Sequence, residues 1–554
     1  MSQRMQQGQP MIIMGEDAQR VKDKDAQEYN ISAARAVAES VRSTLGPKGM
    51  DKMLVDSMGT VTITNDGVTI LQEMDIDNPT AEMIVEVAET QEDEAGDGTT
   101  TAVAIAGELL KEAEDLLEQD IHPTAIIKGF SMAAEQARGE VDDIAERVDP
   151  SDEDLLRKVA ETSMTGKSSE LDKELLAQLV VDAVQAVTVE ADDGTHVVDL
   201  EFVEIETQTG RSASESELLN GAVIDKDPVN DDMPVEFDAA DVLLLNDPIE
   251  VEETDADTSV SIDSPDQLQQ FLDSEERQLR EKVDQIVATG ADVLFCQKGI
   301  DDLAQYLLAK EGILAVRRTK KSDMAFLQEI LGAEIVSDLD SATDAHLGHG
   351  SINRDAEAGL FYVEGDDAHG VTILLRGSTE HVVDELERGI QDALDVVSAT
   401  ASDGRVLAGG GAIEVELAAR LRDYADDISG REQLAVGAFA DALEIVPRVL
   451  ASNAGLDSID TLVSLRAAHE DGDMHAGLDV FSGDVVDTYE AGVVEPAHAK
   501  EQALSSATEA ANLVLKIDDI IAAGDLSTEG DGDEGGAPGG MGGMGGMGGM
   551  GGAM

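Results

Sequence analysis

The hydrophobic positions of this chain follow helical spacing near both ends and form short strand-like runs between them. Apolar residues recur at helical spacing over 26–45, 79–94 and 103–147, which predicts amphipathic helices in these stretches. The same alanine-rich helical texture returns after residue 412. This texture alone leaves open whether the two helical regions pack together in space.

Short strand-like runs make up much of the remaining pattern. Residues 52–55 and 61–64 flank a turn and predict a hairpin, and alternation over 198–205 predicts further strand structure. From about residue 221 several β-rich runs alternate with helices, which is typical of an α/β domain. These runs lie at 242–245, 293–295, 313–316 and 371–375. The domain is expected to close at residues 376–377.

One helix within this α/β region has both ends marked in the sequence. Ser264 is a candidate N-cap, Pro265 fits the first turn and Gly290 fits the exit. A polar, acidic stretch over 250–257 lies just before it. That stretch is either a substrate-facing extension or an ordinary solvated loop, and the sequence does not separate the two.

The segment 96–101, Gly-Asp-Gly-Thr-Thr-Thr, joins two of the predicted helices. A glycine-rich turn that leads into a helix N-terminus offers backbone N–H groups and a favourable dipole to an anion. Asp97 would repel a phosphate unless a cation lies between them, so it indicates Mg²⁺ carried by a nucleotide. The alternative is a plain helix-linking turn in which Asp97 or a threonine caps the next helix.

Three other turns expose backbone beside predicted helices. Residues 44–49 (Thr-Leu-Gly-Pro-Lys-Gly) stop one helix, residues 65–67 (Asn-Asp-Gly) open another, and three glycines at 409–411 precede a third. Consecutive glycines before a helix allow a ligand to approach the backbone closely. An Asn-Asp-Gly run by itself is a turn more often than a site.

Two familiar nucleotide fingerprints fail in this chain. Gly-Lys-Ser at 166–168 imitates the end of a P-loop, but Glu161 occupies the position of its first glycine. Lys167 could still contact a phosphate as a point charge. At the glycine run, Glu414 stands where the dinucleotide fingerprint needs its third glycine.

The composition is strongly acidic. In 554 residues there are 38 Lys and Arg against 117 Asp and Glu, a formal net charge of −79. Such a field disfavours nucleic acid and anionic membranes as partners. The acids spread along the whole chain, which indicates a cytoplasm of very high salt; the alternative is an acidic protein of a mesophile. We therefore expect the melting temperature to rise with KCl concentration, since salt screens the repulsion; greater stability in dilute buffer would contradict this.

Cysteine usage and the N-terminus point to the cytoplasm. Cys296 is the single cysteine, so no intramolecular disulfide can form, and its apolar neighbours predict a buried strand. The N-terminus is polar and lacks an apolar stretch of signal-peptide length. No apolar run approaches the roughly 18 residues that a membrane span needs. The tail over 527–554 is acidic and then Gly-Gly-Met-rich, and is expected to be disordered.

Taken together and in this order, the motifs resemble those of the group II chaperonins, the archaeal thermosome subunits. The matching segments are 44–52, 64–69, 96–101, 163–167, 297–302, 316–318, 389–393, 409–411 and the Gly-Gly-Met tail. The resemblance covers nearly the whole chain. The extreme acidity resembles a haloarchaeal version of the family.

The resemblance implies a multidomain fold in three parts. A mainly α equatorial ATPase domain would combine 1–155 with 408–526, which would join the two helical regions. A small α+β intermediate domain would combine 156–226 with 376–407. An α/β apical domain over 227–375 would carry a helical lid protrusion, from Glu250 to the start of the helix after Ser264.

The resemblance also assigns roles to residues by motif. Asp66 and Asp392 would position or activate the attacking water, Lys167 would sense the γ-phosphate, and Asp97 would hold Mg²⁺. The nucleotide would contact Thr44, Leu45, Gly46, Pro47, Asn65, Gly98, Thr99, Thr100, Thr101, Gly410, Gly411 and Glu495. Glu495 would meet the ribose, where group I chaperonins have an Asp. K⁺ is a further candidate ion.

The implied activity is ATP-dependent folding of non-native proteins inside two stacked rings with a built-in lid. The rings would contain this subunit alone or with sister subunits. Two other classes of function compete with this interpretation. One is an ATP-dependent enzyme acting on a small molecule, which would need a second chemical constellation that the sequence lacks. The other is a passive assembly scaffold without ATPase activity, against which Asp66, Asp97 and Asp392 argue.

Overall fold

The computed structural model describes residues 20–22, 24–55, 59–74, 76–165, 170–190, 196–251, 265–355, 359–365 and 370–521. The chain separates into two compact units, residues 1–27 with 517–554 and residues 28–516. In the first unit, strands β1 (Arg20–Lys22) and β21 (Asp519–Ile521) pair antiparallel. Within the described residues, no helix has the length and apolar character to cross a membrane. The expected disordered tail and the acidic stretch over 252–264 with Ser264 lie outside the described residues.

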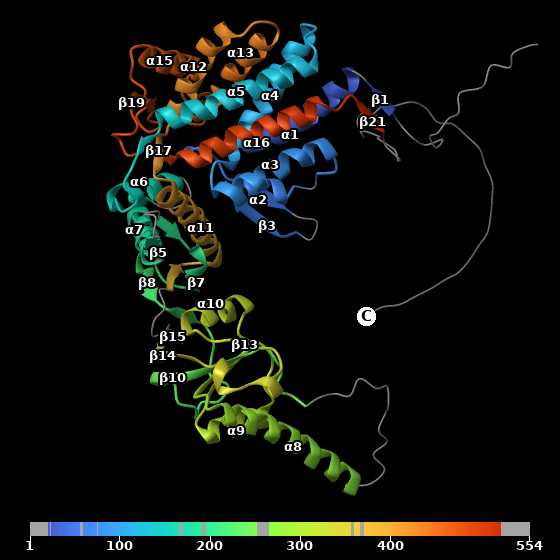
Figure 1. The fold of residues 1–554 in the computed structure, drawn as a ribbon, viewed down its shortest axis with the longest axis vertical. Coiled ribbons are helices and arrows are strands. Elements are labelled where there is room, and N and C mark those ends of the chain that lie inside the picture. Colours follow the sequence, from blue (N-terminus) through green and yellow to red (C-terminus); the bar gives the residue numbers. More distant parts are fainter. Residues whose placement is uncertain are drawn as a thin grey trace, which may run out of the picture. The chain divides into compact units, whose positions relative to one another are not determined.

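The largest hydrophobic core draws on both ends of the sequence, residues 31–144 and 407–515. Figure 1 shows the blue helices of the N-terminal half lying among the orange and red helices of the C-terminal region. Their bounds are α1 (Lys24–Arg42), α2 (Gly67–Gln72), α3 (Pro79–Ala95), α4 (Thr99–Glu118), α5 (Pro123–Ile144), α12 (Ala412–Asp427), α13 (Glu432–Leu443), α14 (Ile445–Asn453), α15 (Ser458–Glu470) and α16 (Ala497–Leu515). Helix α4 packs on α13 and α16, and α5 packs on the same two.

Small residues let these helices approach closely. A Cβ placed on Gly107 of α4 would lie 2.5 Å from the Cβ of Ala38 in α1. One placed on Gly129 of α5 would lie 2.4 Å from the Cβ of Ala435 in α13. Real Cβ contacts are longer, so glycine is required at both crossings. Alanine and glycine therefore fill this core, which has few aromatic side chains, by letting the helices pack at short distances.

Short strands border this core. The hairpin of β2 (Lys52–Val55) and β3 (Val61–Thr64) has the predicted bounds. A three-stranded sheet runs in the order β20 (Val494–Pro496), β17 (Arg405–Ala408) and β4 (Glu146–Arg147), and β18 (Ala476–Leu478) pairs with β19 (Val485–Asp487). The three-stranded sheet of β20, β17 and β4 therefore brings together residues near 146, 406 and 495.

A second core forms around α6 (Glu153–Ser163), α7 (Glu170–Ala186) and α11 (Glu380–Asp403). Its sheet runs in the order β7 (Val203–Thr209), β16 (Val371–Gly377) and β8 (Glu217–Asn220), and β5 (Thr188–Glu190) pairs with β6 (His196–Val198). The strand structure expected over 198–205 is interrupted, because Leu200–Phe202 forms a 3₁₀ turn that the side chain of Asp199 caps.

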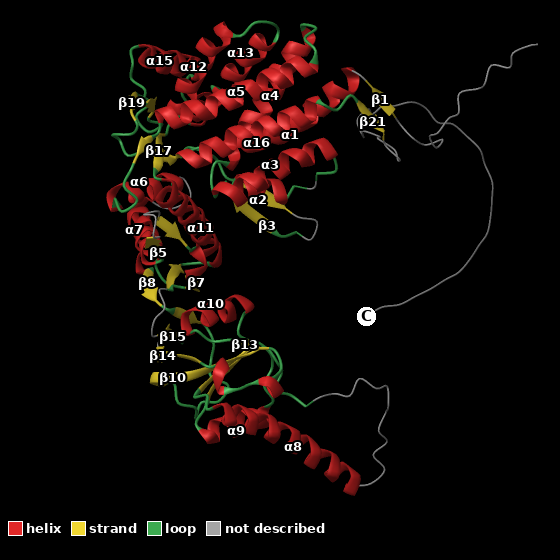
Figure 2. Cartoon of the chain, in the orientation of Figure 1, coloured by secondary structure: helices red, strands yellow, loops and turns green. Residues whose placement is uncertain are grey.

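The third core surrounds a seven-stranded mixed sheet, drawn in yellow in Figure 2. The strand order is β12 (Leu314–Arg317), β11 (Val293–Cys296), β10 (Glu236–Leu245), β14 (Gly348–Asp355), β15 (Leu360–Gly365) and β9 (Ala222–Ile224), with β13 (Ile335–Val336) beside β10. Three helices belong to this region: α8 (Pro265–Thr289), α9 (Asp302–Glu311) and α10 (Lys321–Leu331). Strands β10, β11 and β12 run parallel, and each contains a continuous buried apolar run. Burial in β11 raises the pKa of Cys296 to about 11, as expected for a core thiol.

Two strands belong to a different core from the one that the domain boundaries implied by the resemblance assign to them. Residues 371–375, grouped with the α/β region, form β16, which pairs with β7 and β8 in the second core. Residues 222–224 form β9, which pairs with β15 of the seven-stranded sheet. The change to an α/β pattern near residue 221 agrees with this, whereas the family-based boundary at 226 grouped them with the smaller domain. For β16, hydrogen-bonding partners far away in sequence decide the placement, and a local pattern does not contain them.

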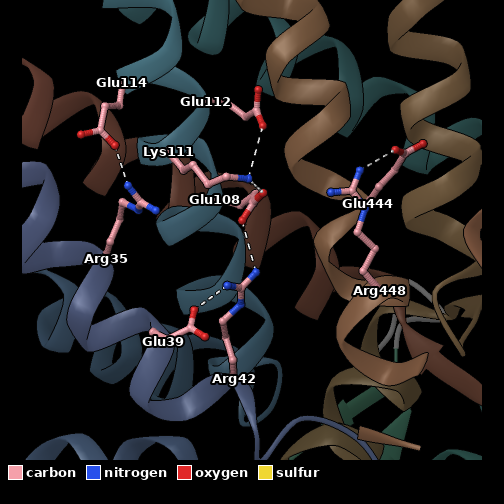
Figure 3. A network of polar contacts seen from close by, with 9 residues as sticks. All are labelled: Arg35, Glu39, Arg42, Glu108, Lys111, Glu112, Glu114, Glu444 and Arg448. Atoms are coloured by element: carbon pink, nitrogen blue, oxygen red, sulfur yellow. Dashed lines mark hydrogen bonds and ion pairs between the residues drawn. The ribbon is translucent and has the colours of Figure 1, made fainter. Parts of the chain in front are cut away.

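Ion pairs, two of them on buried carboxylates, connect the helices of this core. Figure 3 shows Arg35 of α1 paired with Glu114 of α4, and Arg42 of α1 paired with the buried Glu108 of α4. A second buried carboxylate, Glu444, lies between α13 and α14 and is fully shielded from solvent. It accepts hydrogen bonds from Arg466, with Nε at 2.6 Å, and pairs with Arg422 at 2.9 Å.

Replacement of Glu444 by glutamine is expected to lower the free energy of unfolding by about 3 kcal/mol. The change leaves arginines from separate helices without their shared buried anion. The measurement is the guanidinium unfolding midpoint at fixed KCl. The matched control is Glu432→Gln, whose partner Lys128 lies 2.9 Å away and is mostly exposed; its midpoint should scarcely move. Equal midpoints for the two variants would contradict the assignment.

Candidate active site

A cavity of about 470 Å³ lies in the unit formed by residues 28–516. Several segments meet at this cavity: the α1–β2 loop, the starts of α2, α4 and α12, the end of α6, the middle of α11 and the β20–α16 junction. Its lining includes Thr44, Leu45, Gly46, Pro47, Asn65, Asp66, Asp97, Gly98, Thr99, Thr100, Thr101, Asp392, Gly410, Gly411 and Glu495. Lys167 lies outside the described residues. The structure thus brings the other candidate residues to one cavity.

The turn between α3 and α4 is built by two glycines in the left-handed region. Gly96 has φ 64° and ends α3, and Gly98 has φ 84° and begins α4. No side chain caps α4 at Gly98, so the alternative of an Asp97 or threonine cap is not observed. Gln91 donates to the carbonyl oxygens of Asp97 at 2.7 Å and of Ala499 at 3.1 Å, which fixes the turn to α16. The positive end of α4 is therefore presented to the cavity.

The glycine run before α12 repeats this arrangement. Gly410 and Gly411 have φ values of 66° and 81°, and no side chain caps α12 at Gly411. The Leu478 N–H donates to the Gly410 carbonyl at 2.9 Å, which ties the turn to β18. A Cβ on Gly411 would lie 2.8 Å from the Cβ of Pro447, so the turn also packs against α14. Two helix N-termini thus open on the same cavity.

The loop after α1 is held by a residue that the sequence analysis did not single out. Asn453, at the end of α14, donates to the carbonyl oxygens of Leu45 at 2.9 Å and Arg42 at 3.2 Å. Gly46 has φ 78°, and a Cβ there would lie 2.3 Å from Cδ2 of Leu450. The backbone of this loop is therefore fixed against α14, with Pro47 at the cavity.

Two of the candidate carboxylates reach the cavity in different ways. Asp66 caps α2, because its Oδ2 accepts from the Thr69 N–H at 2.7 Å. Asp392 is buried on α11, although composition alone favours a solvated surface position for any single Asp. Helix α11 approaches closely, since a Cβ on Gly96 would lie 2.3 Å from the Cβ of Asp395. Burial also raises the pKa of Asp395 at this contact.

Glu495 belongs to a buried ionic group that the sequence analysis missed. Nζ of Lys500 lies 2.7 Å from Oε2 of Glu495 and 2.6 Å from Oε1 of Glu414. Burial raises the pKa of Glu495, and the ammonium of Lys500 opposes this. Burial alone would lower the pKa of Lys500, but the two carboxylates raise it above its ordinary value. A lysine in the first turn of an amphipathic helix gives no local signal of this role.

Further lining residues also escaped the sequence analysis. Lys173 donates to the hydroxyl of Thr165 at 2.5 Å, and both line the cavity beside the end of α6. Phe481 lines it as well, with the ammonium of Lys48 4.5 Å from its ring centroid. Aromatic residues make up only 3% of the chain, so an isolated Phe in a turn was the one available signal.

The donors at the cavity fit a magnesium ion that arrives with its ligand. Among the described residues, no group of three or more His, Cys, Asp or Glu side chains could hold a metal. Mg²⁺ commonly uses one or two carboxylates and completes its shell with phosphate oxygens and water. Asp97, in a turn between helix ends at the cavity, supplies such a carboxylate. The residues present therefore fit a metal–phosphate complex better than a dedicated metal cage.

Comparison with known proteins agrees with these features. The model of the TCP-1/cpn60 chaperonin family matches residues 37–525. Thermosome subunit 2 of Haloferax volcanii is 82% identical over 541 residues, 97% of each chain, and thermosome subunit beta of Halobacterium salinarum is 74% identical over 530 residues, 95% of each. The open-state monomer of a group II chaperonin from Methanococcoides burtonii is similar with a TM-score of 0.62 and 43% identity, covering 76% of this chain and 100% of that one.

The chain belongs to the TCP-1/cpn60 chaperonin family. Within this family it is a haloarchaeal group II chaperonin, and its function is that of an ATP-dependent chaperonin with ATPase activity. The multidomain chaperonin fold and the nucleotide dependence expected from the sequence are thereby confirmed. The small-molecule enzyme and the passive scaffold are not favoured.

Proposed function

We propose that the cavity binds Mg-ATP and that its hydrolysis drives encapsulation and folding of non-native proteins. The observation that carries this proposal is the meeting of two helix N-termini without side-chain caps, Asp97 and the buried Asp392 at one cavity. Uncapped helix N-termini favour phosphate, and the carboxylates supply the groups that phosphoryl transfer to water needs.

In this proposal, the backbone of 98–101 and the loop 44–47 surround the phosphates. Asp97 would hold Mg²⁺, which would supply positive charge to offset that of the phosphates. Gly410, Gly411 and Glu495 contact the ribose and base, with Thr44 and Asn65 completing the lining. Concentrated K⁺ would be the accompanying monovalent ion.

Hydrolysis would depend on positioning the attacking water. Asp66 and Asp392 accept its hydrogen bonds and orient it toward the γ-phosphorus, a general-base and positioning role. Asp66 is held by its cap on α2, whereas Asp392 comes from α11, a helix of the second core. The catalytic arrangement therefore requires that second core to be in place. Lys167 would sense the γ-phosphate and report its loss.

We further propose that three domains carry out the cycle. The equatorial ATPase domain comprises about 1–155 and 405–526, and the intermediate domain about 156–220 and 371–404. The apical domain covers about 222–370; the lid protrusion that the family resemblance implies near 250–264 lies almost wholly outside the described residues. These limits move β9, β16 and β17 from the sequence-based division, in line with their sheet partners.

Assembly in two stacked rings with sister subunits is also proposed. Haloferax volcanii has thermosome subunits 1 and 2, and subunit 1 is 58% identical to this chain over 545 residues. That relationship supports mixed rings that act on non-native protein clients in the cytoplasm. Eight subunits per ring is the expectation for this family.

A client-folding experiment tests the proposal. A chemically denatured protein is diluted into concentrated KCl with the assembled chaperonin, with Mg-ATP, with Mg-ADP or without nucleotide. We expect capture without nucleotide, and recovery of native activity with Mg-ATP alone. Added protease should degrade the captured client before ATP addition and spare it afterwards. Equal recovery in all three mixtures would contradict an ATP-driven cycle.

A further inference from the structure

Lys500 lies between two carboxylates at one wall of the cavity. Its Nζ is 2.6 Å from Oε1 of Glu414 and 2.7 Å from Oε2 of Glu495. The three side chains come from the first turn of α12, from β20 and from the first turn of α16. The exposed fractions of the side chains are 3% for Glu414, 12% for Lys500 and 25% for the cavity-lining Glu495. The group is therefore an ionic triad in a desolvated setting.

The two carboxylates of the triad differ in their relation to the cavity: Glu495, the inner carboxylate, lines it, and Glu414, the outer carboxylate, does not. Glu495 and Lys500 line the cavity, and Glu414 lies behind them. Within the part of the chain described, Oε2 of Glu414 is buried and accepts no hydrogen bond. Burying charges is costly, and replacing such groups with apolar residues is often neutral or stabilising. Stability alone therefore gives a weak reason for two carboxylates and a lysine at this wall.

The inner carboxylate has one oxygen fixed and one oxygen at the glycine turn. Oε2 of Glu495 accepts from Lys500, whereas a Cβ built on Gly409 would lie 2.9 Å from Oε1. Gly410 and Gly411, the next two residues of that turn, line the cavity. The contact between Lys500 and Oε2 also sets the direction of Oε1, because both belong to one planar carboxylate. An ionised carboxylate only accepts hydrogen bonds, so Oε1 suits a hydroxyl donor and makes no hydrogen bond to an analogue that lacks that hydroxyl.

We propose that Lys500 is a positioning residue that orients Glu495 toward the ribose hydroxyls, that Glu414 fixes Lys500, and that this triad sets the preference for ribonucleotides over 2′-deoxyribonucleotides. The inference rests on the proposed function, in which this cavity binds the nucleotide. A site built to bond a hydroxyl discriminates strongly against the analogue without it, because its buried polar group is left unpaired.

The test compares binding of ADP and 2′-deoxy-ADP, which separates recognition from turnover. The key variant is Glu414→Gln with Lys500→Met in the assembled full-length protein. It removes one negative and one positive charge, so the formal charge of the triad stays the same and only the fixing of Glu495 is lost. The control is Lys128→Met with Glu432→Gln, a Lys–Glu pair between α5 and α13 that does not line the cavity.

Dissociation constants are measured by calorimetry in concentrated KCl with Mg²⁺. Wild type and control are expected to prefer ADP by about tenfold, the value of one hydrogen bond to a charged group. The key variant should show a preference below about twofold, through weaker ADP binding with little change for 2′-deoxy-ADP. If it fails to assemble, Glu414→Gln with Lys500→Leu, which also keeps the formal charge of the triad and removes the hydrogen bond to Glu495, carries the same expectation.

The outcomes distinguish a failure of this inference from a failure of the proposed function. A tenfold preference that persists in the assembled variant overturns the role of Lys500, and equal binding of both nucleotides by wild type overturns the ribose role of the triad. Failure of wild type to bind either nucleotide overturns the proposed function itself. Loss of preference in the Lys128/Glu432 control would show that any broken Lys–Glu pair has this effect, and would also overturn the proposal.

Discussion

Replacement of Asp392 by alanine is expected to lower steady-state ATP hydrolysis by about 10²–10⁴-fold, the contribution of a positioned general base. Binding of Mg-ATP should stay within about threefold of wild type, because the proposed role of Asp392 is exerted on the attacking water and not on the nucleotide. The side chain is buried on α11 and lines the cavity, so its removal acts directly at the proposed reaction centre.

The measurement combines phosphate release with nucleotide binding on the same preparations. Asp384→Ala is the matched control, since Asp384 lies on the same helix and is exposed. It should hydrolyse ATP at the wild-type rate. Wild-type turnover by Asp392→Ala would remove this residue from the mechanism, and equal losses in both variants would mean that α11 had been disturbed as a whole.

Replacement of Asp97 by alanine is the second change with a large expected effect. Its carboxylate is the proposed protein ligand of Mg²⁺ at the start of α4, so the variant should lose the magnesium-dependent part of nucleotide affinity. We expect Mg-ATP binding to weaken by at least about tenfold and hydrolysis to fall by about 10³-fold, since metal stabilisation of transferring phosphates is worth several kcal/mol.

Magnesium titrations at fixed ATP check this expectation. In EDTA, wild type and Asp97→Ala should bind nucleotide with similar, weak affinity, because Mg²⁺ then contributes to the binding free energy of neither protein. Asp93→Ala removes an exposed carboxylate from the last turns of α3 and is the matched control. If Asp97→Ala keeps a wild-type response to Mg²⁺, the ion has another ligand and the assignment fails.

Local patterns predicted much of this fold. The hairpin of β2 and β3 has the predicted bounds, and α3, its glycine exit and α4 follow the predicted order. These features depend on near neighbours in sequence, namely alternation, turn residues and helical spacing. Cys296 in a buried strand was predicted for the same reason.

Features that depend on distant partners were not predictable in this way. Strand β16 is an apolar run like those of the seven-stranded sheet, yet it pairs with β7 and β8. Lys500 gains its role because three segments remote in sequence meet at one wall. In a chain with 117 Asp and Glu residues, composition does not distinguish Asp392, which is buried on α11, and only the family resemblance singled it out.

The central claim is that ATP in this cavity closes a double ring around a client. Electron microscopy of the purified protein in concentrated KCl, with and without Mg-ATP, tests it most directly. The account predicts two stacked rings that are open without nucleotide and closed with it, with nucleotide density between the starts of α4 and α12. Rings that never close, or nucleotide bound elsewhere, would contradict it.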